Sequence, residues 1–193
     1  MSSAIQLIVG LANPGKTYQN TRHNAGAWFI EELVRNANCP LKLETKFHGH
    51  HALVELENQP CHLLIPTTFM NHSGRAVGAL MKFYKIPPHA VLIVHDEIDL
   101  PTGSIKLKFD GGDGGHNGLK DIIAHFHTKQ FHRLRIGVGR PTNSDEVIDY
   151  VLHDPSKTER HEIDQAIQRA LETLPLILAG EFQKAMNKLH SEK

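Results

Sequence analysis

Residues whose side chains can do chemistry gather where strand-like apolar segments end. They include amides, imidazoles, a carboxylate and a thioether: Asn13, His23, Met70, Asn71, Asp96, His116 and Asn117. Imidazoles and carboxylates exchange protons, and amides both donate and accept hydrogen bonds. Because ligands of open α/β sheets bind at the carboxyl ends of the strands, we expect these side chains to converge on one cleft.

A second pattern, Gly10–Thr17, has the spacing G-x-x-x-x-G-K-[ST] of a phosphate-binding loop. It follows a strand-like segment, and Asp96-Glu97 resemble the strand-end acid that holds magnesium in nucleotide triphosphatases. A phosphate loop needs a helix that begins at the Gly-Lys-Thr, because its amides and dipole must face the phosphates. Residues 17–24 contain one apolar residue in eight and cannot bury a helix against a sheet. We therefore reject phosphate binding at this loop.

The elements that position these residues alternate between short apolar segments and segments with helical periodicity, which is typical of α/β folds. Strands are expected at 5–10, 91–94, 104–109 and 133–138, with two or three extended segments within 43–66. Helices are expected at 24–37, 71–84, 117–126, 145–152, 156–179 and 181–190, with Asn24 as a cap and interruptions at Pro175 and Gly180. We expect a single domain, residues 1–193, with a twisted, mixed, mostly parallel sheet flanked by helices on both faces.

Composition narrows the class of protein. The formal net charge is zero, with 21 basic and 21 acidic residues, which argues against holding nucleic acid by bulk charge but allows a local basic patch. No apolar run approaches the ~20 residues needed to cross a bilayer, so we expect no membrane association. Cys39 and Cys61 are far apart in the sequence. Two such cysteines fit a reducing cytoplasm and exclude a disulfide scaffold.

Five segments resemble, in order, the signature segments of bacterial-type peptidyl-tRNA hydrolases: Gly10–Gly15, Thr21–Gly26, Pro66–Asn71, His95–Glu97 and Gly114–Gly118. Each alone is weakly specific, but five in the family's order are very specific, and the resemblance runs from about residue 5 to 190. It implies hydrolysis of the ester that joins a peptide to the 3′-terminal ribose of tRNA, which frees the tRNA for translation. It also implies peptidyl-tRNA as partner, no metal or organic cofactor, no obligatory protein partner, and a monomer.

The resemblance assigns the reaction to residues of suitable chemistry. His23 would be the catalytic base that takes a proton from water, and Asp96 the second catalytic residue, which holds the imidazole in one tautomer. The amides of Asn13, Asn71 and Asn117 would bind the peptide backbone and polarise the scissile carbonyl. Such amides suit a neutral amide better than a charged amino terminus, so N-blocked peptidyl groups would be preferred.

Three further residues are assigned to substrate binding by the resemblance. Tyr18 would lie near the same cleft, and Met70 would be a flexible apolar wall for varied peptide side chains. The role of His116 stays open among substrate contact, support of the glycine-rich loop and proton transfer.

A basic patch is expected on two strands. Lys106 and Lys108 are two residues apart and point to one face, opposite Ile105, Leu107 and Phe109. Arg133 and Arg135 repeat this spacing opposite Leu134, Ile136 and Val138. Ordinary solvated strand faces would give the same pattern. The family resemblance favours Lys108 and Arg135, beside Lys106, as a clamp for the 5′-terminal phosphate of tRNA.

A mobile glycine-rich loop is expected near the site. The run Gly111–Gly115 supplies backbone freedom and close approach to a ligand. The amphipathic segment Asp145–Leu152 could be a lid or a short packing helix.

Two rival functions make different demands on the sequence. A non-catalytic RNA-binding protein of this fold would lack the base or its orienting acid, yet His23 and Asp96 are both present. A metal-dependent hydrolase could use His48, His50 and His51, but two ligands need a third nearby, and no helical i, i+4 pair with an intervening acid occurs. We therefore expect no metal site.

Overall fold

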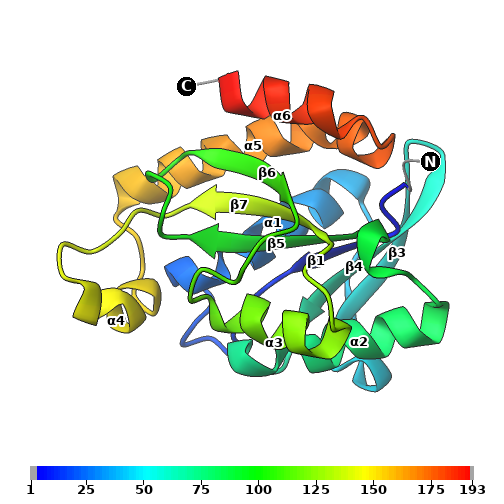
Figure 1. The fold of residues 1–193 in the computed structure, drawn as a ribbon, viewed down its shortest axis with the longest axis horizontal. Coiled ribbons are helices and arrows are strands. Elements are labelled where there is room, and N and C mark those ends of the chain that lie inside the picture. The colour runs from blue at the N-terminus through cyan, green and yellow to red at the C-terminus, as the bar shows by residue number, and fades with distance from the viewer. Residues whose placement is uncertain (1–3, 192–193) are drawn as a thin grey trace.

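The computed structural model of the chain describes residues 4–191, which form a seven-stranded sheet with helices on both faces (Figure 1). The strands are β1 (Leu7–Gly10), β2 (Lys42–Glu44), β3 (Gly49–Leu56), β4 (Gln59–Pro66), β5 (Val91–Glu97), β6 (Ile105–Phe109) and β7 (His132–Gly137). Their order across the sheet is β2-β3-β4-β1-β5-β7-β6. Residues 1–3 and 192–193, the ends of the predicted domain, lie outside the described residues.

The centre of the sheet is parallel and its edges are antiparallel. Strands β4, β1, β5 and β7 are parallel neighbours. Strand β3 is antiparallel to both β4 and β2, so β2 runs with the parallel strands, whereas β6 opposes β7. Five of the seven strands therefore share one direction. The predicted α/β fold with a mixed, mostly parallel sheet is confirmed.

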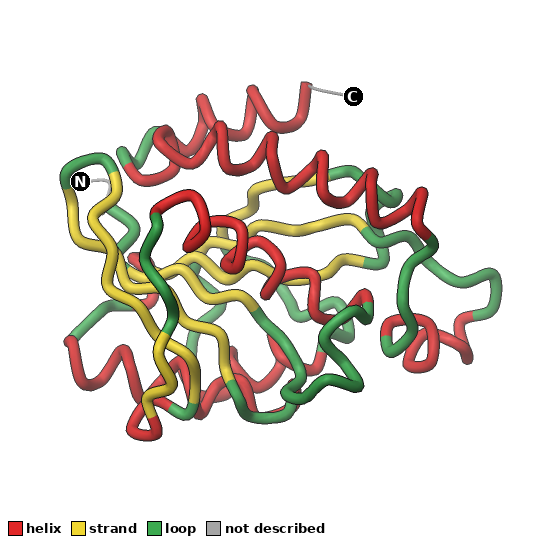
Figure 2. The backbone as a smooth tube through the Cα atoms, turned by 180° about the vertical axis from the view of Figure 1, so that it is seen from behind, coloured by secondary structure: helices red, strands yellow, loops and turns green. Residues whose placement is uncertain are grey.

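Helices cover both faces of the sheet. They are α1 (Ala25–Ala37), α2 (Ser73–Tyr84), α3 (Asn117–Phe126), α4 (Val147–Val151), α5 (Lys157–Leu178) and α6 (Phe182–Ser191). Helices α1, α5 and α6 pack on one face and α2 and α3 on the other, as Figures 1 and 2 show from opposite sides. Within residues 4–191, no helix is both long and apolar enough to cross a membrane.

Strand β5 lies in the middle of the molecule because both of its faces are apolar. Leu92 and Val94 join the core under α1 and α5, whereas Val91 and Ile93 join the core under α2 and α3. All four side chains are fully buried, as the continuous apolar run predicts. The strand continues to Glu97, three residues beyond the predicted end.

Two glycines let helix α1 begin directly against the sheet. A Cβ on Gly10 would come within 2.3 Å of the Gly26 carbonyl oxygen, and a Cβ on Gly26 would come within 2.2 Å of the Val94 carbonyl oxygen. This close approach places the 3-10 turn Arg22–Asn24, which leads into α1, at the carboxyl end of β5. No helix begins at Lys16, so the absence of the helix that a phosphate loop needs is confirmed.

The C-terminal helices depart from prediction at one residue. Gly180 (φ 77°) separates α5 from α6 as expected, but Pro175 lies inside an uninterrupted α5. Leu174, Ile177 and Leu178 around it are buried against the sheet. Burial of each contributes about 1.5–3 kcal/mol, which offsets the roughly 3 kcal/mol cost of a proline inside a helix.

Helix α6 covers the edge strand β6 (Figure 1). The backbone N–H of Leu107 on this strand donates a hydrogen bond of 3.2 Å to His190 Nε2 at the end of α6. At the start of α6, the Phe182 ring stacks on His132 of β7 with ring centroids 3.9 Å apart. The helix is thus tied to the β6–β7 pair at both of its ends.

Candidate active site

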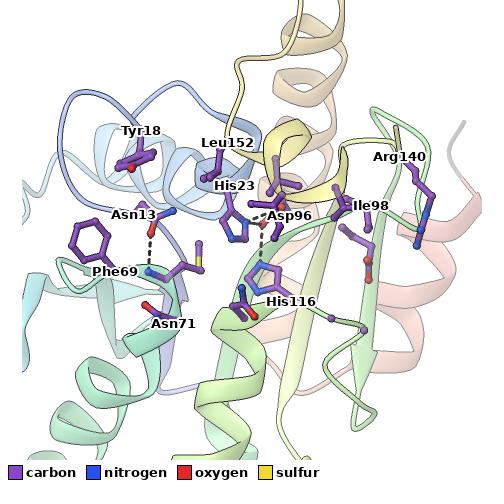
Figure 3. Close-up of a pocket in the computed structure, with 18 of the residues that line it drawn as sticks. Asn13, Tyr18, His23, Phe69, Asn71, Asp96, Ile98, His116, Arg140 and Leu152 are labelled. Atoms are coloured by element: carbon purple, nitrogen blue, oxygen red, sulfur yellow. Dashed lines mark hydrogen bonds and ion pairs between the residues drawn. The ribbon is translucent and has the colours of Figure 1, made fainter. Parts of the chain in front are cut away.

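One cleft of about 710 Å³ opens where the parallel strands end. Every residue assigned from the sequence to catalysis or substrate binding lines it: Asn13, Tyr18, His23, Met70, Asn71, Asp96, His116 and Asn117. Lys106, Lys108 and Arg135 lie outside this cleft, and the last two line a neighbouring pocket. Figure 3 shows His23 and His116 converging on Asp96.

His23 is held by the carboxylate of Asp96. Its Nδ1 lies 2.9 Å from Asp96 Oδ1 and 3.1 Å from Oδ2, with both residues buried. A carboxylate only accepts hydrogen bonds, so in the neutral imidazole Nδ1 carries the proton and Nε2 keeps its lone pair. Nε2 has no hydrogen-bond partner among residues 4–191, and a lone pair in this position can accept a proton from a water molecule in the cleft.

His116 is fixed in the opposite tautomer. Its Nδ1 accepts from the backbone N–H groups of Gly118 (3.1 Å) and Leu119 (3.3 Å) and so caps helix α3. The proton therefore sits on Nε2, which donates to Asp96 Oδ1 at 2.9 Å. Because its acceptor nitrogen is occupied by the helix, His116 cannot take a proton from substrate in this arrangement. The sequence left three roles open for His116: substrate contact, support of the glycine-rich loop and proton transfer. The structure shows a fourth arrangement, in which His116 orients Asp96.

Burial and charge separate the pKa values of these groups. Burial alone lowers the pKa of His23, but the charge of Asp96 and its hydrogen bond raise that pKa above the ordinary histidine value. Burial alone raises the pKa of Asp96, but the two imidazoles hold that pKa well below its usual range. Burial lowers the pKa of the adjacent His95 to about 3, so this ring stays neutral. Asp96 is therefore ionised at neutral pH, and His23 is a stronger base than a solvated histidine.

A network of amides fixes Asn13 at the other wall of the cleft. Asn13 Oδ1 accepts from the Met70 backbone N–H at 2.7 Å (Figure 3). Asn24 holds the backbone of Asn13 from both sides, because its Oδ1 accepts from Asn13 N and its Nδ2 donates to Asn13 O, each at 2.9 Å. With its oxygen occupied, Asn13 presents Nδ2, a donor, to the cleft.

Asn24 supports the cleft wall through Asn13, a contact that the sequence interpretation missed. We predicted that it caps helix α1, but its side chain makes no capping bond and instead binds Asn13 eleven positions earlier. The two residues lie next to each other only because Gly10 and Gly26 allow the close approach described above. Its position beside His23 in the segment Thr21–Gly26 was the only signal available in the sequence.

The remaining assigned residues form the open parts of the cleft. Asn71 lies in the turn before α2 and Asn117 is the first residue of α3, and both are exposed. Met70 is buried. Besides Met70, six apolar residues line the cleft that were not assigned to it individually from the sequence: Phe69, Ile98, Val147, Ile148, Val151 and Leu152. Four of these belong to the amphipathic segment Asp145–Leu152, whose α4 part therefore forms one wall of the cleft.

The basic strands lie as predicted, with two corrections. Register pairs Lys106 with Arg135 and Lys108 with Arg133 across β6 and β7. The Arg133 side chain is buried, however, because its guanidinium donates to the carbonyls of Gly111 and Gly112. Arg133 therefore holds the glycine-rich loop and does not belong to the surface patch.

The second correction concerns the core face of β6. Phe109 is 41% exposed at the end of the strand, where its ring lies 4.6 Å from the ring of His132, centroid to centroid. A further feature that no sequence pattern predicted is the ion pair between Arg135 and Glu97. Arg135 Nε and Nη2 each lie 2.9 Å from Glu97 Oε1.

Among the described residues, one group of three side chains could hold a metal ion, namely His23, Asp96 and His116, with donor atoms within 4.8 Å of one another. In the tautomers described above, both imidazoles direct N–H groups at Asp96, and these protons account for the contacts. In the histidine-rich part of β3, His51 Nε2 instead pairs with His62 Nδ1 at 2.9 Å. No third ligand joins that pair within residues 4–191.

A buried histidine–carboxylate pair at the carboxyl ends of parallel strands is an acid–base site of the kind that α/β hydrolytic enzymes use. The chain belongs to the peptidyl-tRNA hydrolase family, whose model matches residues 7–193. A peptidyl-tRNA hydrolase of Neisseria meningitidis is 50% identical over 192 residues, covering both chains completely. One of Nitrosospira multiformis is 52% identical over 98% of this chain and 99% of its own.

A solved structure agrees with the sequence relatives. The crystal structure of peptidyl-tRNA hydrolase from Acinetobacter baumannii superposes with a TM-score of 0.96 at 46% identity, and the match covers 100% of this chain and 98% of that one. Fold and family are therefore established over nearly the whole length of the chain.

Proposed function

We propose that this enzyme hydrolyses peptidyl-tRNA in the cleft around His23. The bond cleaved is the ester between the peptide and the 3′-terminal ribose, and the freed tRNA returns to translation. The observation that carries the proposal is the pairing of His23 Nδ1 with Asp96, which leaves Nε2 unprotonated in the cleft. A histidine in this state is suited to activate water at neutral pH.

The reaction follows from the groups in the cleft. His23 Nε2 takes a proton from water as the water oxygen bonds to the ester carbonyl carbon. The carbonyl oxygen gains negative charge, and Asn13 Nδ2 and the amide of Asn117 are the donors proposed to stabilise it. The bond from carbon to the ribose oxygen then breaks, and the imidazolium returns its proton to that oxygen. Asp96 stabilises the imidazolium between these steps.

The peptide is bound by amides and apolar side chains. Asn71 and Tyr18 are proposed to contact the peptide backbone, beside the apolar walls formed by Met70, Phe69 and Ile148. These side chains offer no carboxylate to a free amino terminus, which supports a preference for N-blocked peptidyl groups over simple aminoacyl groups.

The tRNA is proposed to lie across β6 and β7. Lys108 and Arg135, with Lys106 beside them, would clamp the 5′-terminal phosphate, and the pocket that Lys108 and Arg135 line supports this assignment. Glu97 is already bound to Arg135, so a phosphate must share the guanidinium with it. We further propose a cytoplasmic monomer that needs no cofactor and no obligatory protein partner, in keeping with two free thiols.

The test is hydrolysis of N-acetylated aminoacyl-tRNA and of its unblocked form by wild type and His23→Ala. We expect wild type to cleave the blocked substrate alone, and loss of the base to reduce the rate roughly 10²–10⁴-fold. Parallel assays with a strong chelator separate this chemistry from a metal-dependent reaction. Normal turnover by His23→Ala would overturn the assignment of the base.

A further inference from the structure

Arg22 directly precedes the proposed base and is buried, with 8% of its surface exposed. Its guanidinium lies at the C-terminal end of helix α4, which packs beside the turn Arg22–Asn24. Nη1 donates to the Tyr150 carbonyl at 2.9 Å and to the His153 carbonyl at 3.4 Å. The Arg22 backbone N–H donates to the same His153 carbonyl at 3.1 Å. One residue thus binds the end of α4 through both its side chain and its backbone.

The guanidinium has two more partners. Its carbon lies 3.9 Å from the centre of the Tyr150 ring, a cation–π distance, and Nη2 lies 3.4 Å from Glu159 Oε2 in the first turn of α5. Glu159 in turn forms a capping box with Ser156. Arg22 therefore joins three segments that are distant in the sequence: the turn of His23, the end of α4 and the start of α5.

Helix α4 needs such an anchor because it cannot hold itself in place. It has five residues, and a helix that short is unstable without tertiary contacts. Ile148 is 69% exposed and Val147 is half-buried, so Val151 is the one residue of this helix whose apolar side chain is buried. Tyr150 supplies the other attachment, since its hydroxyl donates to the Val138 carbonyl at 2.6 Å.

We propose that Arg22 is a positioning residue that ties helix α4, as a lid over the cleft, to the turn that carries His23. The inference rests on the proposed function of the cleft. Through this tie, the apolar wall of α4 stands at a fixed distance from the base, so the enzyme binds the peptide against a preformed surface. The charge of Arg22 acts on the lid and not on the base, because the pKa of His23 is set by burial and by Asp96.

The experiment compares Arg22→Ala and Arg22→Lys with Arg160→Ala. Arg160 is the matched control, because it also makes a cation–π contact (3.6 Å to Trp28) and an ion pair (3.0 Å to Asp164), but lies outside the cleft. We expect Arg22→Ala to raise KM for N-acetylated aminoacyl-tRNA about tenfold, which corresponds to about 1.4 kcal/mol. We expect kcat to change less than about threefold, because the His23–Asp96 pair is intact.

Two readouts separate lid anchoring from general damage. Amide hydrogen exchange of residues 144–153 should accelerate in Arg22→Ala and stay at the wild-type rate in Arg160→Ala. The acid limb of the pH–rate profile should not move. Arg22→Lys should fall between wild type and Arg22→Ala, because lysine keeps a positive charge but lacks the planar fork that reaches the two carbonyls through Nη1 and Glu159 through Nη2.

Other results would overturn the proposal. An unchanged KM with a lower kcat and a shifted acid limb would mean that Arg22 acts on His23 itself. Unchanged amide hydrogen exchange in residues 144–153 of Arg22→Ala would mean that the lid is held by other contacts.

If Arg22→Ala does not fold, Tyr150→Phe tests the same lid from its other attachment. This variant removes the hydroxyl hydrogen bond to Val138, and we expect the same rise in KM and in exchange. Turnover by His23→Ala would instead refute the proposed function and leave the lid measurements standing.

Discussion

Asp96 receives hydrogen bonds from two imidazoles in opposite tautomers, and this pairing defines the chemistry of the site. His116 donates to the carboxylate through Nε2 while its Nδ1 accepts from the first turn of helix α3. The carboxylate is thereby fixed toward His23, the one imidazole of the pair whose second nitrogen is free. The negative charge of Asp96, in this buried setting, raises the pKa of His23.

Asp96→Asn should move the pH dependence of the reaction as well as its rate. A neutral amide removes the charge that raises the pKa of His23, and burial then lowers that pKa. Because the base must be unprotonated, kcat/KM rises with pH through this pKa, so the acid limb should shift to lower pH. The rate should fall roughly 10²–10⁴-fold, since an amide can also favour the wrong tautomer.

The measurement for Asp96→Asn is kcat/KM from pH 5 to 9, with Asp164→Asn as a control carboxylate on the exposed surface. An acid limb that stays at the wild-type position in Asp96→Asn would contradict the role given to the carboxylate.

Single residues were predictable from the sequence where they lie in the family-like segments. His23 and Asp96 are examples, and the structure shows that they form a hydrogen-bonded pair. Single residues were not predictable where two distant residues combine. Asn24 was predicted to cap helix α1 because asparagine is common at the N-cap position. Its side chain instead binds the backbone of Asn13, eleven residues earlier. The pairing of Glu97 with Arg135 likewise depends on the register between β5 and β7, which no local pattern states.

At the level of elements, the β6–β7 pair is the surface on which tRNA recognition is proposed. Antiparallel register sets Lys106 opposite Arg135, so alternation along each strand brings the basic side chains to one face. Acidic residues beside this basic face balance part of its charge, in keeping with a chain of zero net charge. Glu97, Asp99 and Asp113 line the same pocket as Lys108 and Arg135.

Lys108→Ala should weaken the binding of tRNA substrates without affecting a short peptidyl-nucleotide mimic that lacks the 5′ end. The slope of log K against log salt should become shallower by about 0.7–0.9, the contribution of one phosphate contact. Lys42→Ala, on the opposite edge strand β2, provides the control for loss of one lysine. Equal losses on tRNA and on the mimic would refute the clamp.

Elements were well predicted where periodicity is strong, because apolar side chains repeat at the spacing that burial requires. Helix α3 spans the predicted residues 117–126 and α1 begins one residue late. Prediction failed where packing overrides local preference. Pro175 continues α5 because its neighbours are buried, and β5 extends through polar residues because β7 pairs with them as far as Gly137.

At the scale of the whole molecule, several histidines are folded in their neutral form. Burial lowers the pKa of His62 and of His132 to about 4, with a further lowering from His51 and from His89, respectively. The same cause lowers the pKa of His95 to about 3. In the unfolded chain these rings titrate near 6.5, so protonation favours unfolding as the pH falls.

The contribution of these rings to the free energy of unfolding should therefore be complete above about pH 6.5 and decline as the pH falls from about 6.5 to about 4, where His62 and His132 themselves titrate. His132→Phe keeps a ring stacked on Phe182 but removes one titrating group, so the decline should become shallower by about one proton. Urea unfolding at half-unit pH steps measures both slopes. Identical slopes in wild type and variant would show that His132 is not protonated on unfolding.

The bond between His190 and Leu107 has a consequence for how copies of the chain meet one another. An edge strand with free backbone groups is a template onto which a second chain can add its own strand, and this is a common start of aggregation. By covering β6 and taking up one of its N–H groups, helix α6 blocks that route at one side of the sheet. Helix α6 thus shields from a second chain the same strand that carries the proposed tRNA contacts.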